Sequence, residues 1–182
     1  MINGEKCTLR PLRSEDAKRL SEIVNDLEVR EYLSNPFLYM EQREEKFIES
    51  LALQKVPTDI VFGIEVDGKL IGTVGLHSIN WVSRNCYFAI AIDKEYWNRG
   101  IGTEATRLIL KYAFEHLNLH KVLLEVYEYN ERAIRVYEKV GFKVEGRLRK
   151  NRYLKGKYYD VIVMELLQEE YFGEADKVRS EG

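Results

Sequence analysis

Cysteine, histidine and net charge are all scarce in this sequence, and each shortage excludes a class of protein. The 182 residues include two cysteines, Cys7 and Cys86, too few for a disulfide framework. Three histidines occur without the carboxylate spacing that would complete a metal site, so we expect no metal. The 28 Lys and Arg and 30 Asp and Glu residues give a formal net charge of -2, without the basic excess typical of nucleic-acid binding.

Long apolar runs are absent as well. No run reaches the length of a membrane-spanning helix, and the first five residues lack a signal-peptide pattern. We therefore expect a cytoplasmic protein with no nucleic-acid partner and no membrane partner. Hydrophobic residues make up 45% of the chain, which is enough for one domain with a sizeable core.

The order of the hydrophobic patterns predicts the fold class. Helical patterns come first, a strand meander follows, and a β-loop-α-β-α-β-β segment closes the chain. The predicted strands cover residues 7–10, 60–66, 69–79, 86–92, 121–127, 142–149 and 158–167, and the predicted helices begin at Ser14, Met40, Ile101 and Asn130. This order indicates an α/β (α+β) fold with a mixed, mostly antiparallel central sheet and helices on both faces. We expect a single domain over residues 1–167 and a polar C-terminal tail over residues 168–182.

A loop with two glycines, residues 98–103, is the most informative feature of the chain. It connects the predicted apolar strand over residues 86–92 to the helix that begins at Ile101. The apolar residues of that helix lie along one face. Such a loop presents unpaired backbone N–H groups at the positive end of the helix dipole. The segment therefore predicts a site for a phosphate or pyrophosphate group.

Two familiar phosphate motifs do not fit this loop. A Walker loop needs a lysine after its last glycine, and Gly102 is followed by Thr103. Residues 100–105 do match the dinucleotide pattern G-x-G-x-x-G/A, with Glu125 about 20 residues further on. That pattern, however, places its first glycine directly after the strand, whereas residues 93–99 intervene here. Dinucleotide binding is therefore the weaker interpretation.

Three segments together resemble the GNAT superfamily of acetyl-CoA-dependent N-acetyltransferases. They are Tyr96-Trp97-Asn98-Arg99-Gly100-Ile101-Gly102-Thr103-Glu104-Ala105, then Asn130, then Tyr137-Glu138-Lys139-Val140-Gly141-Phe142. Other residues resemble its ribosomal-protein N-terminal (Rim-type) branch: Arg10-Pro11-Leu12 with Asp16, Gly146-Arg147, Gly156-Lys157 and Tyr159-Asp160. The resemblance implies a GNAT-like domain that uses acetyl-CoA as its co-substrate.

The resemblance also implies which residues bind acetyl-CoA. The backbone N–H groups expected to hold the pyrophosphate belong to Asn98, Arg99, Gly100, Ile101, Gly102 and Thr103. The pantetheine arm is expected to pair like a strand with Ile90, Ala91 and Ile92, and Asn130 is expected to contact the same arm. The family has Gln or Arg where this chain has Trp97, which affects only a side-chain contact.

Acetyl transfer to an amine requires a neutral amine, a stabilised oxyanion and a proton for the departing thiolate. The resemblance assigns the proton donor to Tyr137, because a tyrosine, with a pKa of about 10, stays protonated at neutral pH. Tyr137 follows Asn130 by two helical turns, so both residues lie on one helix face. The alternative interpretation is a core tyrosine and a simple helix N-cap.

The base is expected to be Glu125, in the segment Leu124-Glu125-Val126. A glutamate in an apolar strand is unusual, and the resemblance places the base of peptide N-acetyltransferases there. The alternative is a carboxylate that faces solvent or pairs with a lysine. An α-amine, with a pKa of about 8, is already partly neutral at pH 7, so a water chain would then suffice.

Three other candidates are weaker. His116 and His120 have i, i+4 spacing for a metal, but capping of a helix C-terminus is the simpler interpretation. Cys86 as a nucleophile lacks an adjacent histidine, and a buried strand cysteine is the default. His77 lies on the strand before the cofactor strand and could line the acceptor cleft, although a core or surface histidine is equally consistent.

The expected acceptor is a protein or peptide N-terminal α-amine, attacked directly in a ternary complex. The alternative is a polyamine or another small amine, whose cleft would gather carboxylates. Five glutamates of the early helical region could supply them: Glu28, Glu31, Glu41, Glu44 and Glu45. A non-catalytic acyl-CoA-binding module is disfavoured, because binding alone would not require Tyr137. A homodimer is a further possible assembly.

Overall fold

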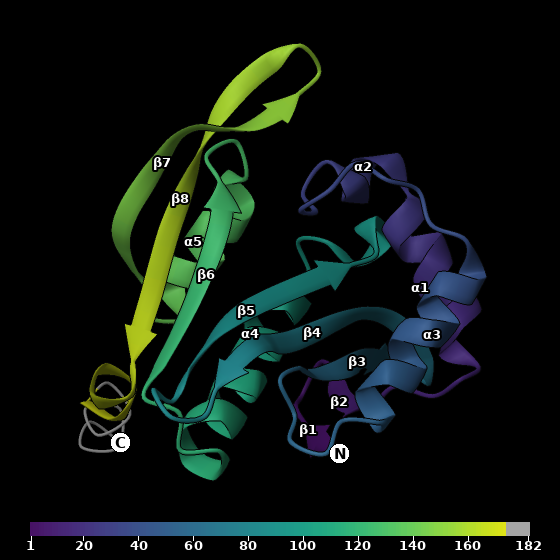
Figure 1. Cartoon of the computed structure of the whole chain (residues 1–182), viewed down its shortest axis with the longest axis horizontal. Helices are drawn as coiled ribbons and strands as arrows, with labels where there is room; N and C mark the ends of the chain where they lie inside the picture. Colours follow the sequence, from purple (N-terminus) through teal and green to yellow (C-terminus); the bar gives the residue numbers. More distant parts are fainter. Residues whose placement is uncertain (174–182) are drawn as a thin grey trace. The chain divides into compact units, whose positions relative to one another are not determined.

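The structure, a computed structural model, describes residues 1–173 (Figure 1). The labelled elements of this range are eight strands, five α-helices, one 3-10 helix and one π-helical turn, and a further helical segment covers residues 168–173. The elements are β1 (Ile2–Asn3), β2 (Thr8–Pro11), α1 (Asp16–Asn25), α2 (Leu27–Arg30), α3 (Glu41–Ala52), β3 (Ile60–Val66), β4 (Lys69–Asn80), β5 (Asn85–Ile92), η1 (Lys94–Tyr96), α4 (Ile101–Lys111), η2 (Tyr112–His116), β6 (Lys121–Tyr127), α5 (Glu131–Lys139), β7 (Lys143–Leu154) and β8 (Lys157–Leu167).

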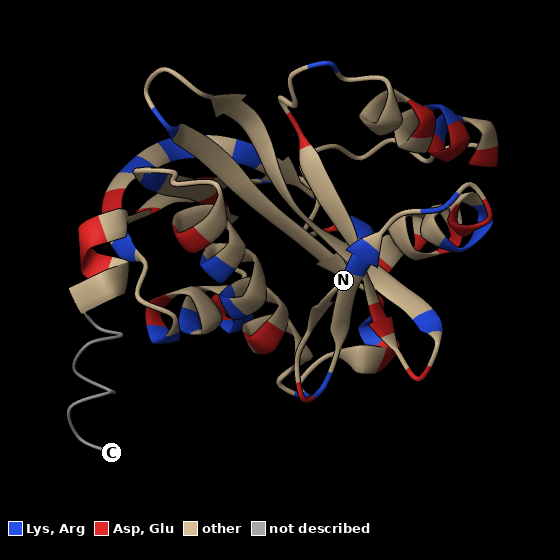
Figure 2. Ribbon diagram, turned by 90° about the horizontal axis from the view of Figure 1, so that it is seen from below, with Lys and Arg blue, Asp and Glu red and all other residues tan. Residues whose placement is uncertain are grey.

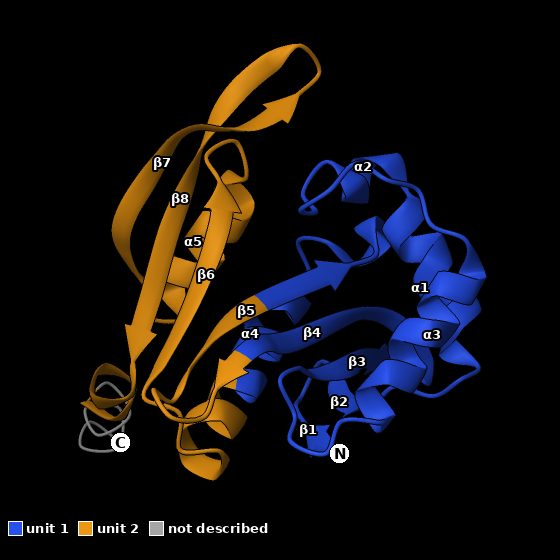
Figure 3. Ribbon diagram, viewed as in Figure 1, with its two compact units in different colours: residues 1–78, 89–109 blue, residues 79–88, 110–182 orange. Residues whose placement is uncertain are grey.

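The chain divides into two compact units (Figure 3). Unit 1 comprises residues 1–78 and 89–109, and unit 2 comprises residues 79–88 and 110–182. Strand β5 and helix α4 each pass from one unit to the other. The expected single domain over residues 1–167 stays a prediction. Of the expected polar tail, residues 168–173 are helical, and residues 174–182 lie outside the described part of the chain.

In unit 1, strands β1 to β4 pair in sequence order as an antiparallel meander, and β5 follows β4. The turn between β3 and β4 is Asp67-Gly68, with φ angles of 49° and 76°, as its hairpin signal predicts. In β4 the consecutive residues Val74, Gly75 and Leu76 are all buried. Because successive side chains point to opposite faces, both faces of this strand are covered, which agrees with the predicted fold class.

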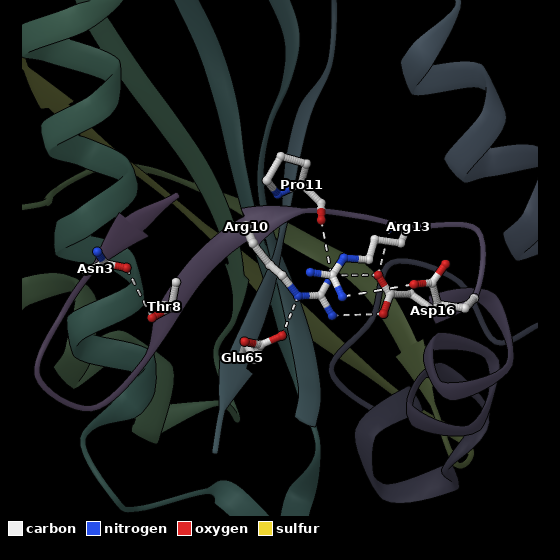
Figure 4. Close-up of polar contacts among 8 residues, drawn as sticks. Asn3, Thr8, Arg10, Pro11, Arg13, Asp16 and Glu65 are labelled. Atoms are coloured by element: carbon white, nitrogen blue, oxygen red, sulfur yellow. Dashed lines mark hydrogen bonds and ion pairs between the residues drawn. The ribbon is translucent and has the colours of Figure 1, made fainter. Parts of the chain in front are cut away.

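A buried ion pair connects β2, α1 and β3 in unit 1 (Figure 4). Arg10 donates to both carboxylate oxygens of Asp16, at 2.7 and 2.9 Å, and to Glu65 at 2.5 Å. Asp16 also accepts the backbone N–H of Arg13 at 2.7 Å. Burial alone would raise the pKa of Asp16, but these hydrogen bonds hold it below its ordinary value. The Arg10…Asp16 signature is therefore structural. The prediction that Ser14 caps this helix is wrong: α1 begins at Asp16, Glu15 is at its N-cap, and no side chain makes a capping hydrogen bond.

In unit 2, β5 and β6 pair in parallel, and β6, β8 and β7 follow as antiparallel neighbours. The centre of β6 is buried, with Leu124 opposite Met164. Helix α5 contributes Tyr137 to an aromatic group with Phe88 and Phe142.

Lys and Arg residues are mixed with Asp and Glu on the helices (Figure 2). This distribution agrees with the nearly neutral composition.

Candidate active site

The segment that follows β5 in unit 1 is fixed by Asp93. The backbone N–H of Asp93 donates to the Ile71 carbonyl at 2.8 Å, and its carboxylate accepts the N–H of Glu95 at 3.0 Å. The carboxylate, largely buried, also forms an ion pair with Arg19 of α1. These contacts fix the end of β5, and therefore also the position at which the segment leading to the glycine loop begins.

The glycine loop has the backbone conformation that favours an anion. Asn98 and Gly100 adopt positive φ angles of 60° and 78°, whereas Arg99 between them does not. Alternation of this kind turns successive N–H groups toward one side. Helix α4 then begins at Ile101, and the first N–H to bond back is that of Glu104, which donates to Gly100 at 3.1 Å. The N–H groups of residues 101–103 thus precede the first helical hydrogen bond, and their binding of a pyrophosphate stays a prediction.

An N-terminal segment is held against the first turn of α4, directly after this loop, by Glu104, a contact that the sequence reasoning missed. The Glu104 carboxylate accepts the backbone N–H groups of Glu5, Lys6 and Cys7 at 3.0, 2.8 and 2.8 Å. Burial alone would raise the pKa of Glu104, but the three N–H donors hold it below its ordinary value. A Cβ on Gly100 would lie 3.6 Å from the Lys6 ammonium nitrogen. The Lys6 side chain therefore lies beside Gly100 of the loop.

The end of β5 is joined to the loop by Trp97. The indole N–H of Trp97 donates to the Ile92 carbonyl at 2.8 Å, and the ring packs edge-on against Tyr32 at 5.7 Å. Trp97 thus stabilises the loop at the position where the family has Gln or Arg. The pairing of Ile90, Ala91 and Ile92 with a pantetheine arm stays a prediction, and one of its three carbonyls already accepts this hydrogen bond.

In unit 2, Glu125 lies on the exposed side of β6. Its neighbours Leu124 and Val126 are 1% and 4% exposed and point to the opposite face. The parallel register of β6 with β5 runs from Lys121 to Leu123, and beyond it Glu125 pairs across to Val163 of β8. Glu125 therefore has the accessibility that a base needs. Its assignment as the base stays a prediction.

Asn130 and Tyr137 share helix α5, as predicted. The side-chain oxygen of Asn130 accepts the N–H of Ala133 at 3.3 Å, so Asn130 caps the helix. Tyr137 is 8% exposed and packs edge-on between Phe88 and Phe142, at 5.7 and 5.9 Å. Burial raises the pKa of Tyr137 well above its ordinary value. The phenol therefore keeps its proton, and core packing and proton donation are compatible roles.

The structure places the weaker candidates, Cys86 and the three histidines, in different surroundings. Cys86 is fully buried, and burial raises the pKa of its thiol to about 12, so no thiolate is available for nucleophilic attack. His116 and His120 are exposed, and His116 packs against Tyr112. No group of three or more His, Cys, Asp or Glu within residues 1–173 is placed to hold a metal ion. His77 is hydrogen-bonded to Asp59, a pairing that the sequence reasoning missed.

The glutamates of the early helical region are partly engaged within unit 1. Glu28 accepts a hydrogen bond from Lys94 at 2.7 Å. Glu44 is buried beside Arg43, at 3.6 Å, and burial raises its pKa above the ordinary value. Glu41 and Glu45 are exposed. These two are therefore the carboxylates most available to a cationic acceptor.

Comparison with known proteins identifies the family. A family model described as an acetyltransferase (GNAT) domain matches residues 6–143. The spermidine N(1)-acetyltransferase of Escherichia coli K12 is 35% identical over 178 residues, which cover 96% of this chain and 92% of that protein. The Bacillus subtilis protein named "Putative ribosomal N-acetyltransferase YdaF" is 33% identical over 176 residues, covering 94% and 96%.

A solved structure extends the likeness to three dimensions. The spermidine N-acetyltransferase of Vibrio cholerae, in complex with CoA and spermine, superposes with a TM-score of 0.85 at 30% identity, covering 93% of this chain and 99% of that one. No helix among residues 1–173 is long and apolar enough to cross a membrane. The predicted superfamily and the mixed α/β fold are thereby confirmed, while the Rim-type branch stays a prediction. The chain belongs to the GNAT acetyltransferase family and is an acetyl-CoA-dependent N-acetyltransferase.

Proposed function

We propose that the acceptor is a linear polyamine of the spermidine class. The main support for this proposal is the similarity of this chain to two spermidine acetyltransferases. The similarity covers nearly the full length of this chain and of each relative, and one relative has been solved with CoA and spermine. This support exceeds that for a peptide N-terminus, the acceptor expected from the sequence. The exposed carboxylates of Glu41 and Glu45 have the charge that a polyamine requires.

The residues of unit 1 are proposed to bind the co-substrate. The N–H groups of residues 98–103 fit a pyrophosphate, because the loop conformation and the start of α4 leave them unpaired within the helix. The co-substrate supplies an acetyl thioester. Lys6, held by Glu104, adds a positive charge beside this loop. Ile90 and Ala91 are proposed to offer strand-like backbone pairing.

The residues of unit 2 are proposed to move protons and orient the arm. Tyr137 keeps its proton until a thiolate develops, because burial disfavours the phenolate. Asn130 has its amide NH₂ group available while its oxygen caps α5. Glu125 is exposed and is proposed to attract the cationic acceptor or accept its proton. The V. cholerae relative occurs as a dodecamer, and we propose that this chain also self-associates.

An acceptor panel tests the proposal. Purified protein with acetyl-CoA is offered spermidine, spermine, and short peptides with a free, small N-terminal residue, and CoA release is measured for each. We expect the polyamines to be acetylated with a kcat/KM at least tenfold above the peptides. A second candidate, the peptide N-terminus, is favoured by the B. subtilis relative. Acetylation of peptides with none of spermidine would replace the first candidate by the second.

A further inference from the structure

His77 and Asp59 form a hydrogen-bonded pair within unit 1 that no proposed role has used. The Nδ1 atom of His77 lies 2.9 Å from the Oδ1 atom of Asp59. Because an ionised carboxylate only accepts hydrogen bonds, Nδ1 carries the hydrogen and donates it. The Nε2 atom then carries the free lone pair. It makes no hydrogen bond to any residue among 1–173.

The aspartate is itself held in place. Its second carboxylate oxygen accepts the hydroxyl of Thr58 at 2.9 Å. The side-chain amide of Gln54 accepts the N–H of Asp59 at 3.1 Å and donates to the Asp59 carbonyl, also at 3.1 Å. A carboxylate that orients an imidazole, and is oriented in turn, is the arrangement found behind general-base histidines.

Glycine at position 75 leaves room for the His77 ring. A Cβ at Gly75 would lie 2.6 Å from Nε2 and 3.2 Å from Cε1 of His77, closer than side chains tolerate. The ring therefore lies over Gly75, on the face of β4 that these two residues share. Ser78, directly after His77, has a φ of 50°, a local irregularity of the kind that redirects a strand side chain.

This face of β4 continues onto the end of β5 that belongs to unit 1. The Asp93 N–H bonds to Ile71, and a Cβ on Gly72 would meet the Ala91 carbonyl. Strands β4 and β5 are hydrogen-bonded neighbours in the sheet, so His77 lies on the strand next to β5. Ala89 is exposed, and the His77 side chain is 32% exposed. The partly exposed imidazole therefore lies on the strand next to β5, the strand expected to hold the pantetheine arm.

We propose that His77 accepts the proton of the incoming amine and that Asp59 is its positioning residue. The proposal rests on the proposed acetyl transfer and names a base other than Glu125. Within residues 1–173, the charged group hydrogen-bonded to the imidazole is Asp59, which precedes β3.

The proton and electron balance is closed by groups already named. A protonated amine gives one proton to Nε2 of His77, and its nitrogen lone pair then forms the C–N bond to the thioester carbonyl carbon. The C–S bond breaks, and its electron pair leaves with sulfur, which is protonated through solvent by the second proton lost from the nitrogen. His77 releases its own proton to solvent. The products are an N-acetyl amine, a thiol and one proton.

The test compares His77→Gln, Asp59→Asn and the control His120→Gln, which changes an exposed histidine outside the proposed machinery. We expect His77→Gln to lower kcat about 10²-fold at neutral pH, with the KM for acetyl-CoA unchanged. The deficit should shrink as pH rises toward the pKa of a primary alkyl amine, about 10.4. Asp59→Asn should lower kcat about tenfold. His120→Gln should match the parent. A His77→Gln variant with the kcat of the parent overturns the proposal.

A second readout is independent of turnover. The nitrogen chemical shifts of His77 should report the Nδ1–H tautomer in the parent and lose that preference in Asp59→Asn. An Nε2–H tautomer in the parent overturns the proposal. The kinetic comparison uses whichever amine the parent acetylates. Activity on peptides alone would therefore overturn the polyamine proposal and leave the test of His77 intact.

Discussion

Removal of the Glu104 carboxylate should loosen the N-terminal segment from the glycine loop. Glu104→Ala deletes three hydrogen bonds from backbone N–H groups, at 2.8 to 3.0 Å, to a charged acceptor. Such bonds are worth about 1.5–3 kcal/mol each when buried, but two of these lie at exposed positions where water competes. We therefore expect a loss of about 2 kcal/mol in the free energy of unfolding at pH 7.

The pH dependence of this loss follows from the direction of the pKa shift. The folded-state pKa of Glu104 is lowered, so its stabilisation is fully present above the unfolded-state value and is lost as pH falls through the folded-state value. Urea unfolding of parent and Glu104→Ala at pH 7 and below pH 4 measures this. The difference between the two proteins should shrink on acidification.

A matched control separates the hydrogen bonds from the helix dipole. Glu41 is an exposed glutamate in the first turn of α3, just as Glu104 lies in the first turn of α4. Glu41→Ala removes the favourable dipole term alone, worth about 0.5 kcal/mol. Equal unfolding free energies for the two variants at pH 7 would refute the reasoning. A loss for Glu104→Ala that persists unchanged in acid would refute it as well.

Four further changes address the proposed site. Lys6→Gln should weaken CoA binding about threefold to tenfold in low-salt calorimetry, with the effect fading as salt is added, whereas Lys69→Gln, at the exposed start of β4, should bind as the parent does. Gly100→Ala should weaken CoA binding about tenfold, because an alanine is strained at a φ of 78°; unchanged calorimetric affinity would contradict this. Tyr137→Phe should keep CoA affinity and lower kcat about 10²-fold, and a kcat equal to the parent's would remove it from the mechanism. Glu125→Gln should raise the KM for a polyamine more than it lowers kcat, if Glu125 attracts the acceptor; the reverse pattern in steady-state kinetics would instead favour it as the base.

Local chemistry explains which parts of the fold could be predicted. The Asp67-Gly68 turn and the Asn130 cap each depend on residues within four positions of one another. The same holds for the loop over residues 98–103, whose glycine and asparagine supply the positive φ angles. The prediction that Ser14 caps α1 is wrong: the helix begins at Asp16, and the carboxylate of Asp16 is bound by Arg10 of β2, a contact between separate elements.

Contacts distant in sequence explain what could not be predicted. Glu104 bonds to residues 97 to 99 positions away, and nothing near it in the chain indicates those partners. Asp59 and His77 are 18 positions apart and meet because their strands pair in one register. A register is set by turns and bulges together, so a polar residue at the start of one strand cannot be assigned a partner from spacing alone.

The acceptor is the hardest part to predict, for a related reason. A polyamine is bound by carboxylates that remain unpaired, and a sequence shows only how many carboxylates there are. Of the glutamates considered, Glu28 is paired with Lys94 and Glu44 is buried beside Arg43. Their number thus overstates the negative charge that an acceptor would meet. The pairing in three dimensions leaves Glu41 and Glu45 exposed, and the specificity of this surface should therefore depend on these two far more than on Glu28 or Glu44.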